Sequence, residues 1–280
     1  MRVSTKARMN RMFTNGGCLD VAIDHGVCNE PSFMVGLEDM PGVMDTLIKA
    51  RPDAIQCAYG HADLLQSRPE KDKPALVMRI DMGNPYNDQR HSVMWSQLQS
   101  ADEPILGAIE MDAAAVVVNL FMLPDEPELF RQCVDNISRV REACRKYGMP
   151  LMIEPLVMLP NDVRGGYQVD GDAEKIVTLV RLASEMGADI IKADPTEKAE
   201  DFHRVIEAAR VPVLVRGGGK EDLKTVLMKS AALLAQGAQG MVYGRNIYQH
   251  DNPKAVVAGL MAMIHDGVGG EEAWDIYNRG

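Results

Sequence analysis

The chain has 280 residues, of which 46% are hydrophobic and 25% charged, and it carries a formal net charge of -10 at pH 7. A chain of this size can bury one large core, and barrel folds of similar length commonly form a single domain. The negative charge argues against general affinity for nucleic acid or for anionic membranes, so an anionic substrate requires a local cluster of positive charge.

The sequence also favours a protein of the cytoplasm. No apolar run approaches the roughly 20 residues that span a bilayer, and the first residues lack the apolar core of a secretion signal. The cysteines number five and form no CxxC pair. This pattern argues against a disulfide framework or a structural zinc site and suits a reducing compartment.

Strand-like and helix-like segments alternate along the chain. The strand candidates are short apolar runs bounded by turn-forming residues, and they cover residues 18–23, 53–57, 74–81, 113–121, 151–154, 188–192, 212–215 and 240–243. Helical periodicity lies between them, at residues 42–50, 126–147, 172–186, 198–209, 222–235 and from 252 onward. Gly148 is suited to end the second of these helices, Asp172 to cap the third and Pro253 to open the last.

This alternation predicts one (β/α)8 barrel, the TIM barrel, in which residues 1–280 form a single α/β domain with right-handed crossovers. An open doubly wound sheet is the alternative. That fold usually carries a GxGxxG fingerprint after its first strand, whereas this chain has Asp-His-Gly-Val-Cys at residues 24–28. The sequence shows no low-complexity linker and no second domain.

One strand contains a lysine where the strand is expected to end, at Lys192 in the run Gly-Ala-Asp-Ile-Ile-Lys. A lysine seldom lies in a buried apolar run unless it has a partner or a task. Loss of hydration in a pocket lowers a lysine's pKa and leaves more free amine, which attacks ketones to form Schiff bases. The alternative is a stem that lies along the barrel, with the ammonium paired to a carboxylate such as Asp194.

Polar residues stand at the carboxyl ends of nearly all the predicted strands, where TIM barrels have their active sites. We expect these side chains to converge on one cavity. Taken singly, Asn119 and Asp81 more often satisfy backbone groups of loops. The residues at these ends are Asp24, His25, Arg79, Asp81, Asn119, Glu154, Lys192, Arg216, Gly244 and Arg245.

Glycine-rich turns follow the last two strands. TIM barrels frequently bind phosphate at this place through backbone N–H groups, and glycine lets the backbone approach the anion closely. Arginines there can add charge-assisted hydrogen bonds. A run of glycines can also be a tight turn and nothing more. The predicted phosphate ligands are Arg216, Gly217, Gly218, Gly219, Gly244 and Arg245.

Several of these segments together resemble one superfamily of enzymes. They are DHG at residues 24–26, the strand GADIIK that ends at Lys192, the late glycine turn, and GMVYGRNIYQ at residues 240–249. They resemble the class I aldolases of the archaeal-type fructose-bisphosphate, tagatose-bisphosphate and deoxyribose-phosphate aldolase group, over most of the chain. The resemblance implies that Lys192 is the Schiff-base lysine, that Asp24 lies beside it, and that Gly217, Gly218, Gly244 and Arg245 hold a phosphate.

The chain also departs from that pattern. The archaeal fructose-bisphosphate enzymes have an aromatic pair with an acid/base tyrosine on the fifth strand, where this chain has Ile153-Glu154-Pro155-Leu156. That stretch resembles the tagatose-bisphosphate branch, which implies that Glu154 is the acid/base. Arg79 stands where a lysine is common, and position 216 is an arginine in place of the usual serine. These differences argue against fructose 1,6-bisphosphate itself as the substrate.

The predicted reaction is the reversible cleavage of a phosphorylated ketose to dihydroxyacetone phosphate and an aldehyde. A protonated imine on Lys192 withdraws electrons from the bond that breaks, and Glu154 moves the protons, with Asp24 orienting a substrate hydroxyl. An ion pair with Arg216 or Lys192 is the alternative role for Glu154. We expect Arg79 and Arg216 to contribute to substrate binding. The prediction includes no cofactor and no metal, and the resembling enzymes are usually homo-oligomers.

Other functions fit parts of the same sequence. A thiolase-like or transaldolase-like transfer would use the same lysine. Metal-dependent aldol cleavage would gather His25, His61 and His91 with Asp24 around zinc, although their spacing matches no short ligand motif. A barrel that senses a sugar phosphate without turnover is a further alternative, which ligand-dependent melting would reveal.

Overall fold

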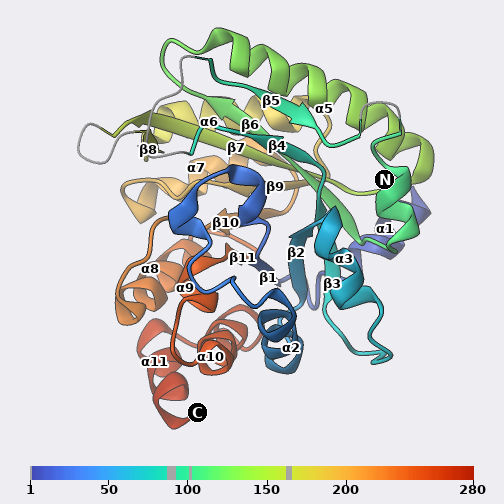
Figure 1. The fold of residues 1–280 in the computed structure, drawn as a ribbon. Helices are drawn as coiled ribbons and strands as arrows, with labels where there is room; N and C mark the ends of the chain where they lie inside the picture. Colours follow the sequence, from blue (N-terminus) through green and yellow to red (C-terminus); the bar gives the residue numbers. More distant parts are fainter. Residues whose placement is uncertain (1, 87–92, 101–102, 162–165) are drawn as a thin grey trace.

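The computed structural model describes residues 2–86, 93–100, 103–161 and 166–280 (Figure 1). Eight parallel strands form a closed ring, since each pairs with the next along the chain and the last pairs with the first. This arrangement confirms the predicted (β/α)8 barrel in a single α/β domain. The barrel strands are β1 (Cys18–Ala22), β2 (Ala54–Ala58), β3 (Ala75–Arg79), β6 (Ala115–Met122), β7 (Leu151–Pro160), β9 (Ile190–Ala193), β10 (Val213–Arg216) and β11 (Gly240–Tyr243).

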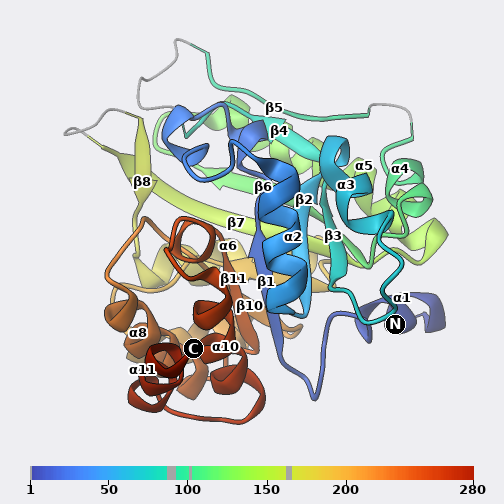
Figure 2. The same ribbon diagram turned by 60° about the horizontal axis from the view of Figure 1, so that its bottom comes forward.

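Helices surround the strands, and Figures 1 and 2 show α5 along one side of the barrel with α10 and α11 on the opposite side. The longer helices are α2 (Met40–Ala50), α3 (Tyr59–Gln66), α5 (Pro127–Tyr147), α6 (Ala173–Glu185), α7 (Phe202–Ala209), α8 (Leu223–Ala235), α10 (Pro253–His265) and α11 (Gly270–Arg279). The shorter ones are α1 (Val3–Met9), α4 (Leu106–Glu110), α9 (Arg245–Tyr248), η1 (His25–Cys28), η2 (Pro31–Phe33) and η3 (Ala199–Asp201).

The core has two layers because barrel strands are buried on both faces and their side chains alternate. On β1, Leu19 and Val21 belong to the larger cluster between strands and helices. Cys18 and Ala22 belong to the smaller cluster inside the barrel, which also contains Val242. The residues that carry the site therefore lie on the inward set of positions, above a floor of apolar side chains.

Local signals in the sequence set several helix ends as predicted. The Asp172 side chain accepts a hydrogen bond from the backbone N–H of Lys175 and caps α6. Gly148 ends α5 with a φ of 66°, a left-handed conformation that glycine adopts without strain. Asn252 caps α10, which opens with Pro253.

Two strand pairs outside the barrel were not predicted. The strand expected to end at residue 154 continues to Pro160 as β7, and its last residues pair antiparallel with β8 (Tyr167–Val169). Between β3 and α4, β4 (Asp81–Gly83) pairs antiparallel with β5 (Ser96–Leu98). The segments of α1, α3 and α4 were also not assigned to helices. Both added pairs lie beyond the carboxyl ends of barrel strands.

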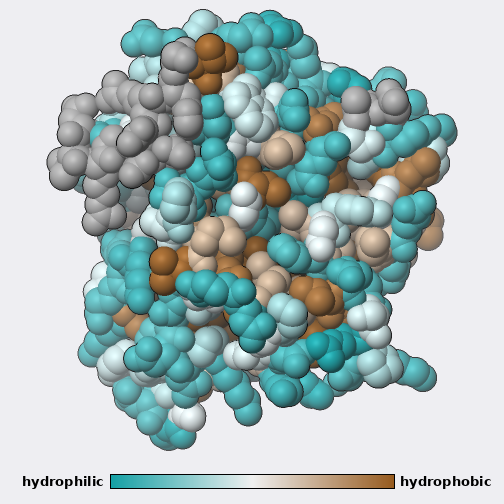
Figure 3. Space-filling view, in the orientation of Figure 1, coloured by the Kyte–Doolittle hydropathy of each residue, from teal (hydrophilic) through white to brown (hydrophobic). Residues whose placement is uncertain are grey.

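The face of the molecule in Figure 3 is mostly hydrophilic, and its hydrophobic side chains form small separate groups. Among the described helices, none is both long enough and apolar enough to cross a bilayer.

Candidate active site

A cavity of about 270 Å³ opens at the carboxyl ends of the barrel strands. The side chains that line it come from both termini of the barrel sequence, because β1 and β11 are neighbours in the ring. The structure therefore brings the predicted site residues together. Those that line the cavity are Asp24, Arg79, Glu154, Lys192, Arg216, Gly217, Gly218, Gly219, Gly244 and Arg245.

Lys192 lies on β9 with 4% of its surface exposed, and its side chain lines the cavity. Its Nζ is 3.0 Å from Oε2 of Glu154 and donates a hydrogen bond of 3.5 Å to Oε1 of Gln56. The alternative in which the ammonium pairs with a carboxylate is therefore present, but with Glu154 and not with Asp194, which accepts hydrogen bonds from Arg216. The amine thus faces a carboxylate on the neighbouring strand within a closed pocket.

Arg79 joins three carboxylates. Its Nε is 2.8 Å from Oδ2 of Asp24, its Nη1 is 3.2 Å from Oδ1 of Asp81, and its Nη2 donates to Oε2 of Glu154. Its side chain is 5% exposed, so these pairs are shielded from water. The guanidinium therefore fixes the carboxylates of Asp24 and Glu154, and Arg79 also lines the cavity.

Asp81 was one of the strand-end residues expected to converge on the cavity, but it is not among the residues that line it. Its Oδ2 accepts hydrogen bonds from the backbone N–H of Asn119 at 2.7 Å and from the Asn119 side chain at 3.0 Å. The alternative reading, in which Asp81 satisfies backbone groups, therefore describes its contacts correctly.

Arg216 provides a second buried cation near Glu154. Its Nε lies 2.6 Å from Oδ1 of Asp194 and 3.9 Å from Oε1 of Glu154. Asp194 in turn accepts a hydrogen bond from the backbone N–H of Val157, in the part of β7 beyond the predicted strand end. Glu154 is consequently close to Lys192, Arg79 and Arg216 at once, so the ion pairs foreseen for it are present.

The cations keep two carboxylates of the cavity charged. Burial works against the charged form of Asp24, but Arg79 and Lys192 outweigh it and hold the pKa of Asp24 well below its usual range. Burial also opposes the charged form of Glu154, and Lys192 and Arg79 again lower its pKa. Glu154 is therefore ionised at neutral pH and can accept a proton from the lysine beside it.

The glycine turns form one end of the cavity. Arg245 donates a hydrogen bond of 3.1 Å to the carbonyl of Gly218, which ties the two turns together, and its guanidinium lies 4.3 Å from the ring centre of Phe33. The backbone N–H of Gly217 donates to the carbonyl of Val242 within the barrel. Among the described residues, none accepts from the N–H of Gly218 or Gly219. A cation and unpaired donors thus meet at this end, as anion binding requires.

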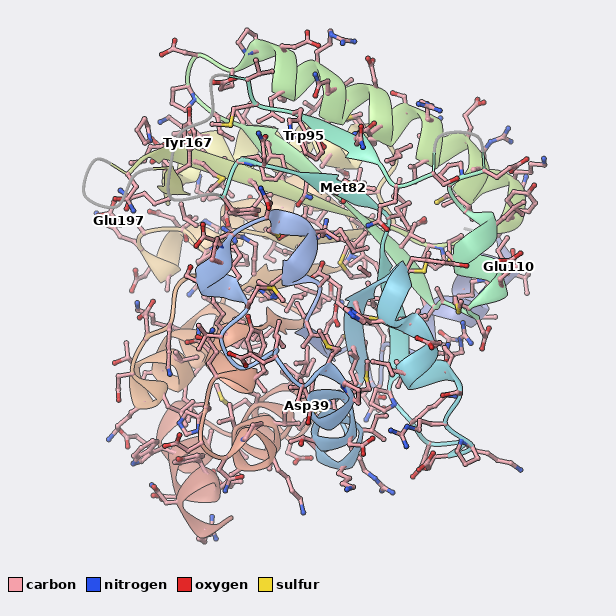
Figure 4. All side chains as sticks on the ribbon, in the orientation of Figure 1. Asp39, Met82, Trp95, Glu110, Tyr167 and Glu197 are labelled. Carbon is pink, nitrogen blue, oxygen red and sulfur yellow. The ribbon has the colours of Figure 1, made fainter. Side chains whose placement is uncertain are left out.

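Aromatic side chains wall the cavity between these ends. His25 makes edge contacts with Phe33, and Phe33 with Tyr86, at ring separations of 5.5 and 5.6 Å. Burial lowers the pKa of His25 to about 4, so its imidazole is neutral at pH 7. Tyr86 and Tyr167 reach the cavity from the two unpredicted additions, and Figure 4 shows Tyr167 between α5 and the η1–η2 segment in that view.

Two further polar residues were missed by the sequence reasoning. Gln56 donates a hydrogen bond of 2.6 Å to Oδ2 of Asp24 and accepts the one from Lys192, so it links the two. Asp20 is completely buried inside the barrel. Both are polar residues within short apolar strands. This is the same sequence signal that singled out Lys192, so it could have found them.

The two described histidines of the metal alternative, His25 and His61, lie in different places. His25 lines the cavity, whereas His61 is exposed on α3, and His91 lies outside the described residues. In the described ranges no three His, Cys, Asp or Glu side chains are grouped so as to hold a metal ion.

Comparison with known proteins gives the family. Residues 18–250 match the model of the DeoC/LacD family aldolases. The chain is 30% identical to an uncharacterized aldolase of Saccharolobus solfataricus, over 94% of this chain and 95% of the relative. It is 28% identical to a 3-hydroxy-5-phosphonooxypentane-2,4-dione thiolase of Escherichia coli K12, over 97% of this chain and 86% of the relative.

A solved archaeal fructose-1,6-bisphosphate aldolase, with its catalytic lysine bound to the carbinolamine intermediate of its substrate, shares the fold. Its TM-score is 0.74 at 21% identity, and the match covers 93% of this chain and 99% of that one. The match of the family model over most of the barrel, together with the lysine cavity at the strand ends, shows that the chain belongs to the DeoC/LacD family of class I aldolases.

Proposed function

We propose that this protein is a Schiff-base aldolase that reversibly cleaves a phosphorylated ketose and releases dihydroxyacetone phosphate and an aldehyde. The single observation that carries the proposal is the position of Lys192, whose amine is buried in the cavity 3.0 Å from the carboxylate of Glu154. A poorly hydrated amine beside an ionised carboxylate has both the nucleophile and the base that imine formation requires.

In this proposal Glu154 is the acid/base. It accepts a proton from the ammonium of Lys192, and it later takes the proton of the substrate hydroxyl as the carbon–carbon bond breaks. The iminium on Lys192 receives the electrons of that bond as an enamine. Asp24, held by Gln56 and Arg79, orients a hydroxyl of the substrate. Arg79 and Arg216 hold the carboxylates in place, and Arg216 also lies at the start of the glycine turn.

The phosphate would bind at the opposite end of the cavity. Backbone groups of Gly218, Gly219 and Gly244 would lie against the phosphate, and the Arg245 guanidinium would supply the positive charge. Gly217 would shape the turn. The net charge of the whole chain is negative, so this local cation is what attracts an anionic substrate. A location in the cytoplasm and a homo-oligomeric state remain predictions from the sequence and the family resemblance.

The proposal is tested by reductive trapping. Incubation with dihydroxyacetone phosphate and borohydride should add the mass of the reduced adduct to the peptide that contains Lys192. The Lys192→Met variant should show no adduct and should lose at least about 10⁴-fold in turnover, because the covalent route is gone. Lys198→Met, at the N-terminal end of η3, is the matched control and should be trapped as the native protein is. Full turnover by Lys192→Met would overturn the proposal.

A transfer reaction is the second candidate, because some relatives of similar coverage are named as thiolases. That reaction would use the same amine and the same phosphate end. The two are separated by products: cleavage of phosphorylated ketoses without an acceptor supports the aldolase, whereas product formation only in the presence of an added thiol supports the transferase. A transaldolase would instead require an acceptor aldehyde.

A further inference from the structure

Arg245 differs from the other cations of the cavity in its partners. Lys192, Arg79 and Arg216 each lie against carboxylates. The Arg245 guanidinium instead donates a hydrogen bond of 3.1 Å to the carbonyl of Gly218, and no carboxylate of the described residues lies within ion-pair distance of it. Its positive charge is therefore not neutralised there, and it is available to an anion at the glycine turns.

The ring of Phe33 lies against this guanidinium. The central carbon of the guanidinium, Cζ of Arg245, is over the ring at 4.3 Å from its centre. That distance is well inside the roughly 6 Å over which an aromatic face attracts a cation. Both side chains line the cavity. Because the ring is uncharged, it attracts the guanidinium without cancelling the charge that an anion would meet.

Phe33 is itself held by defined neighbours. Its ring makes edge contacts with those of His25 and Tyr86, with ring centres 5.5 and 5.6 Å apart. Its backbone carbonyl accepts a hydrogen bond of 2.9 Å from the hydroxyl of Tyr248. The ring is therefore a fixed surface, and an arginine that lies against it is restricted in its orientation.

The helix that carries the arginine also holds the aromatic segment. α9 begins with Arg245 and ends with Tyr248, the donor to the Phe33 carbonyl. The next side chain, Gln249, donates a hydrogen bond of 2.8 Å to the carbonyl of Val35. The segment after β11 and the end of η2 are therefore joined beside the glycine turns, although they come from opposite ends of the chain.

This arrangement favours anion binding for two physical reasons. An arginine side chain loses rotational freedom when an anion fixes it, and a guanidinium that is already stacked has lost part of that freedom beforehand. A carboxylate partner would also orient the guanidinium, but its negative charge would repel the incoming phosphate. An aromatic face orients the cation without that repulsion.

We propose that Phe33 is a positioning residue for phosphate binding, whose ring orients the Arg245 guanidinium toward the glycine turns and leaves its charge available to the anion. This inference rests on the phosphate end of the function proposed above. The ring acts on the anion through Arg245, so its loss changes the affinity for phosphate and not the chemistry at Lys192.

The experiment first measures the affinity for inorganic phosphate by titration calorimetry. Leucine has no aromatic face, so we expect Phe33→Leu to bind phosphate about five- to tenfold more weakly than the native protein. Phe33→Tyr retains the face and should bind within about twofold of native. The same proteins are then trapped at Lys192 with saturating dihydroxyacetone phosphate and cyanoborohydride. The maximal trapping rate should agree within about twofold, because the amine and its base are unchanged.

A fluorinated ring separates the attraction of the cation from packing. Replacement of Phe33 by a trifluorophenylalanine keeps nearly the same shape and weakens the negative face of the ring. We expect phosphate to bind at least about threefold more weakly than in the native protein. This variant also serves if leucine is not tolerated. An unchanged affinity overturns the inference, since it shows that the ring only packs against its neighbours.

Phe130 provides the matched control. It packs against the core from α5 and is not among the residues that line the cavity. Phe130→Leu and the same fluorinated replacement at this position should bind phosphate as the native protein does. A loss there equal to the loss at position 33 overturns the inference, because it shows a general effect on the fold.

The two readouts keep the inference and the proposed function apart. A native protein that does not bind phosphate overturns the inference, as does a maximal trapping rate in Phe33→Leu that falls as far as its phosphate affinity. A native protein that binds phosphate but gives no adduct at Lys192 overturns the Schiff-base function alone. The phosphate affinities of the Phe33 variants then still decide the inference.

Discussion

Arg79 is the residue on which the arrangement of the candidate site most depends. One guanidinium contacts Asp24, Asp81 and Glu154, which come from three different strands or strand extensions. A lysine has a single charged nitrogen and cannot place three donors in the fixed geometry of a guanidinium. The arginine at this position therefore orients both proposed catalytic carboxylates with one side chain.

Removal of that side chain should be costly for stability as well as for activity. We expect Arg79→Met to lower the free energy of unfolding by about 3–5 kcal/mol, because it leaves buried carboxylates without their shared partner. Urea unfolding followed by circular dichroism measures the change. Arg204→Met, which breaks only the exposed pair between Arg204 and Glu174, should change little. Equal losses in the two variants would contradict this account of Arg79.

At the residue scale the sequence predicted the reactive groups better than their partners. Lys192 and Glu154 stand out because charged residues are rare inside apolar strands, and the structure places them 3.0 Å apart. The pairing of Asp194 with Arg216 rather than with Lys192 depends on the stagger between β9 and β10, which no local pattern encodes. Gln56 and Asp20 carried the same signal as Lys192 but were not singled out.

At the scale of elements, the barrel strands were predictable because each is a short apolar run between turn signals. The pair β4–β5 was not, since each strand has three residues and no periodicity extends over so short a length. The extension of β7 was missed because Pro155 argues for a strand end. The strand continues there since Leu156 and Val157 pair with β6, and its tip pairs with β8.

The glycine turn after β10 allows a test at this scale. A methyl group at Gly218 would meet no atom within 4 Å and would project into open space at the proposed phosphate end. We expect Gly218→Ala to keep the melting temperature and to raise the KM for a phosphorylated ketose by about tenfold, or about 1.4 kcal/mol. Gly60→Ala, on α3 and likewise without close neighbours, is the control. An unchanged KM in Gly218→Ala would place the phosphate elsewhere.

At the scale of the whole molecule, the protonation of Asp20 makes the free energy of unfolding depend on pH. Its folded-state pKa of about 8 lies above its usual value of 3.8, so the folded protein holds a proton that the unfolded chain releases. The stabilisation from this group is fully present below about pH 4 and is lost as the pH rises to about 8, with a slope of at most about 1.4 kcal/mol per pH unit.

The Asp20→Asn variant should therefore have a flatter stability curve. Its free energy of unfolding, measured with urea at several pH values between about 4 and about 8, should fall less than that of the native protein over this range. Parallel curves for the two proteins would show that Asp20 has the same proton affinity in the folded and unfolded chains.

The pairing of β1 with β11 also constrains how the protein is made. Cys18 of β1 pairs with Gly240 of β11. More than two hundred residues must therefore leave the ribosome after β1 before it can pair with β11. Until then the nascent chain holds a curved sheet with a free edge at each side, and such edges invite pairing with other chains. A chain whose synthesis stops before β11 would therefore be a fragment that is prone to aggregate, and not a smaller active enzyme.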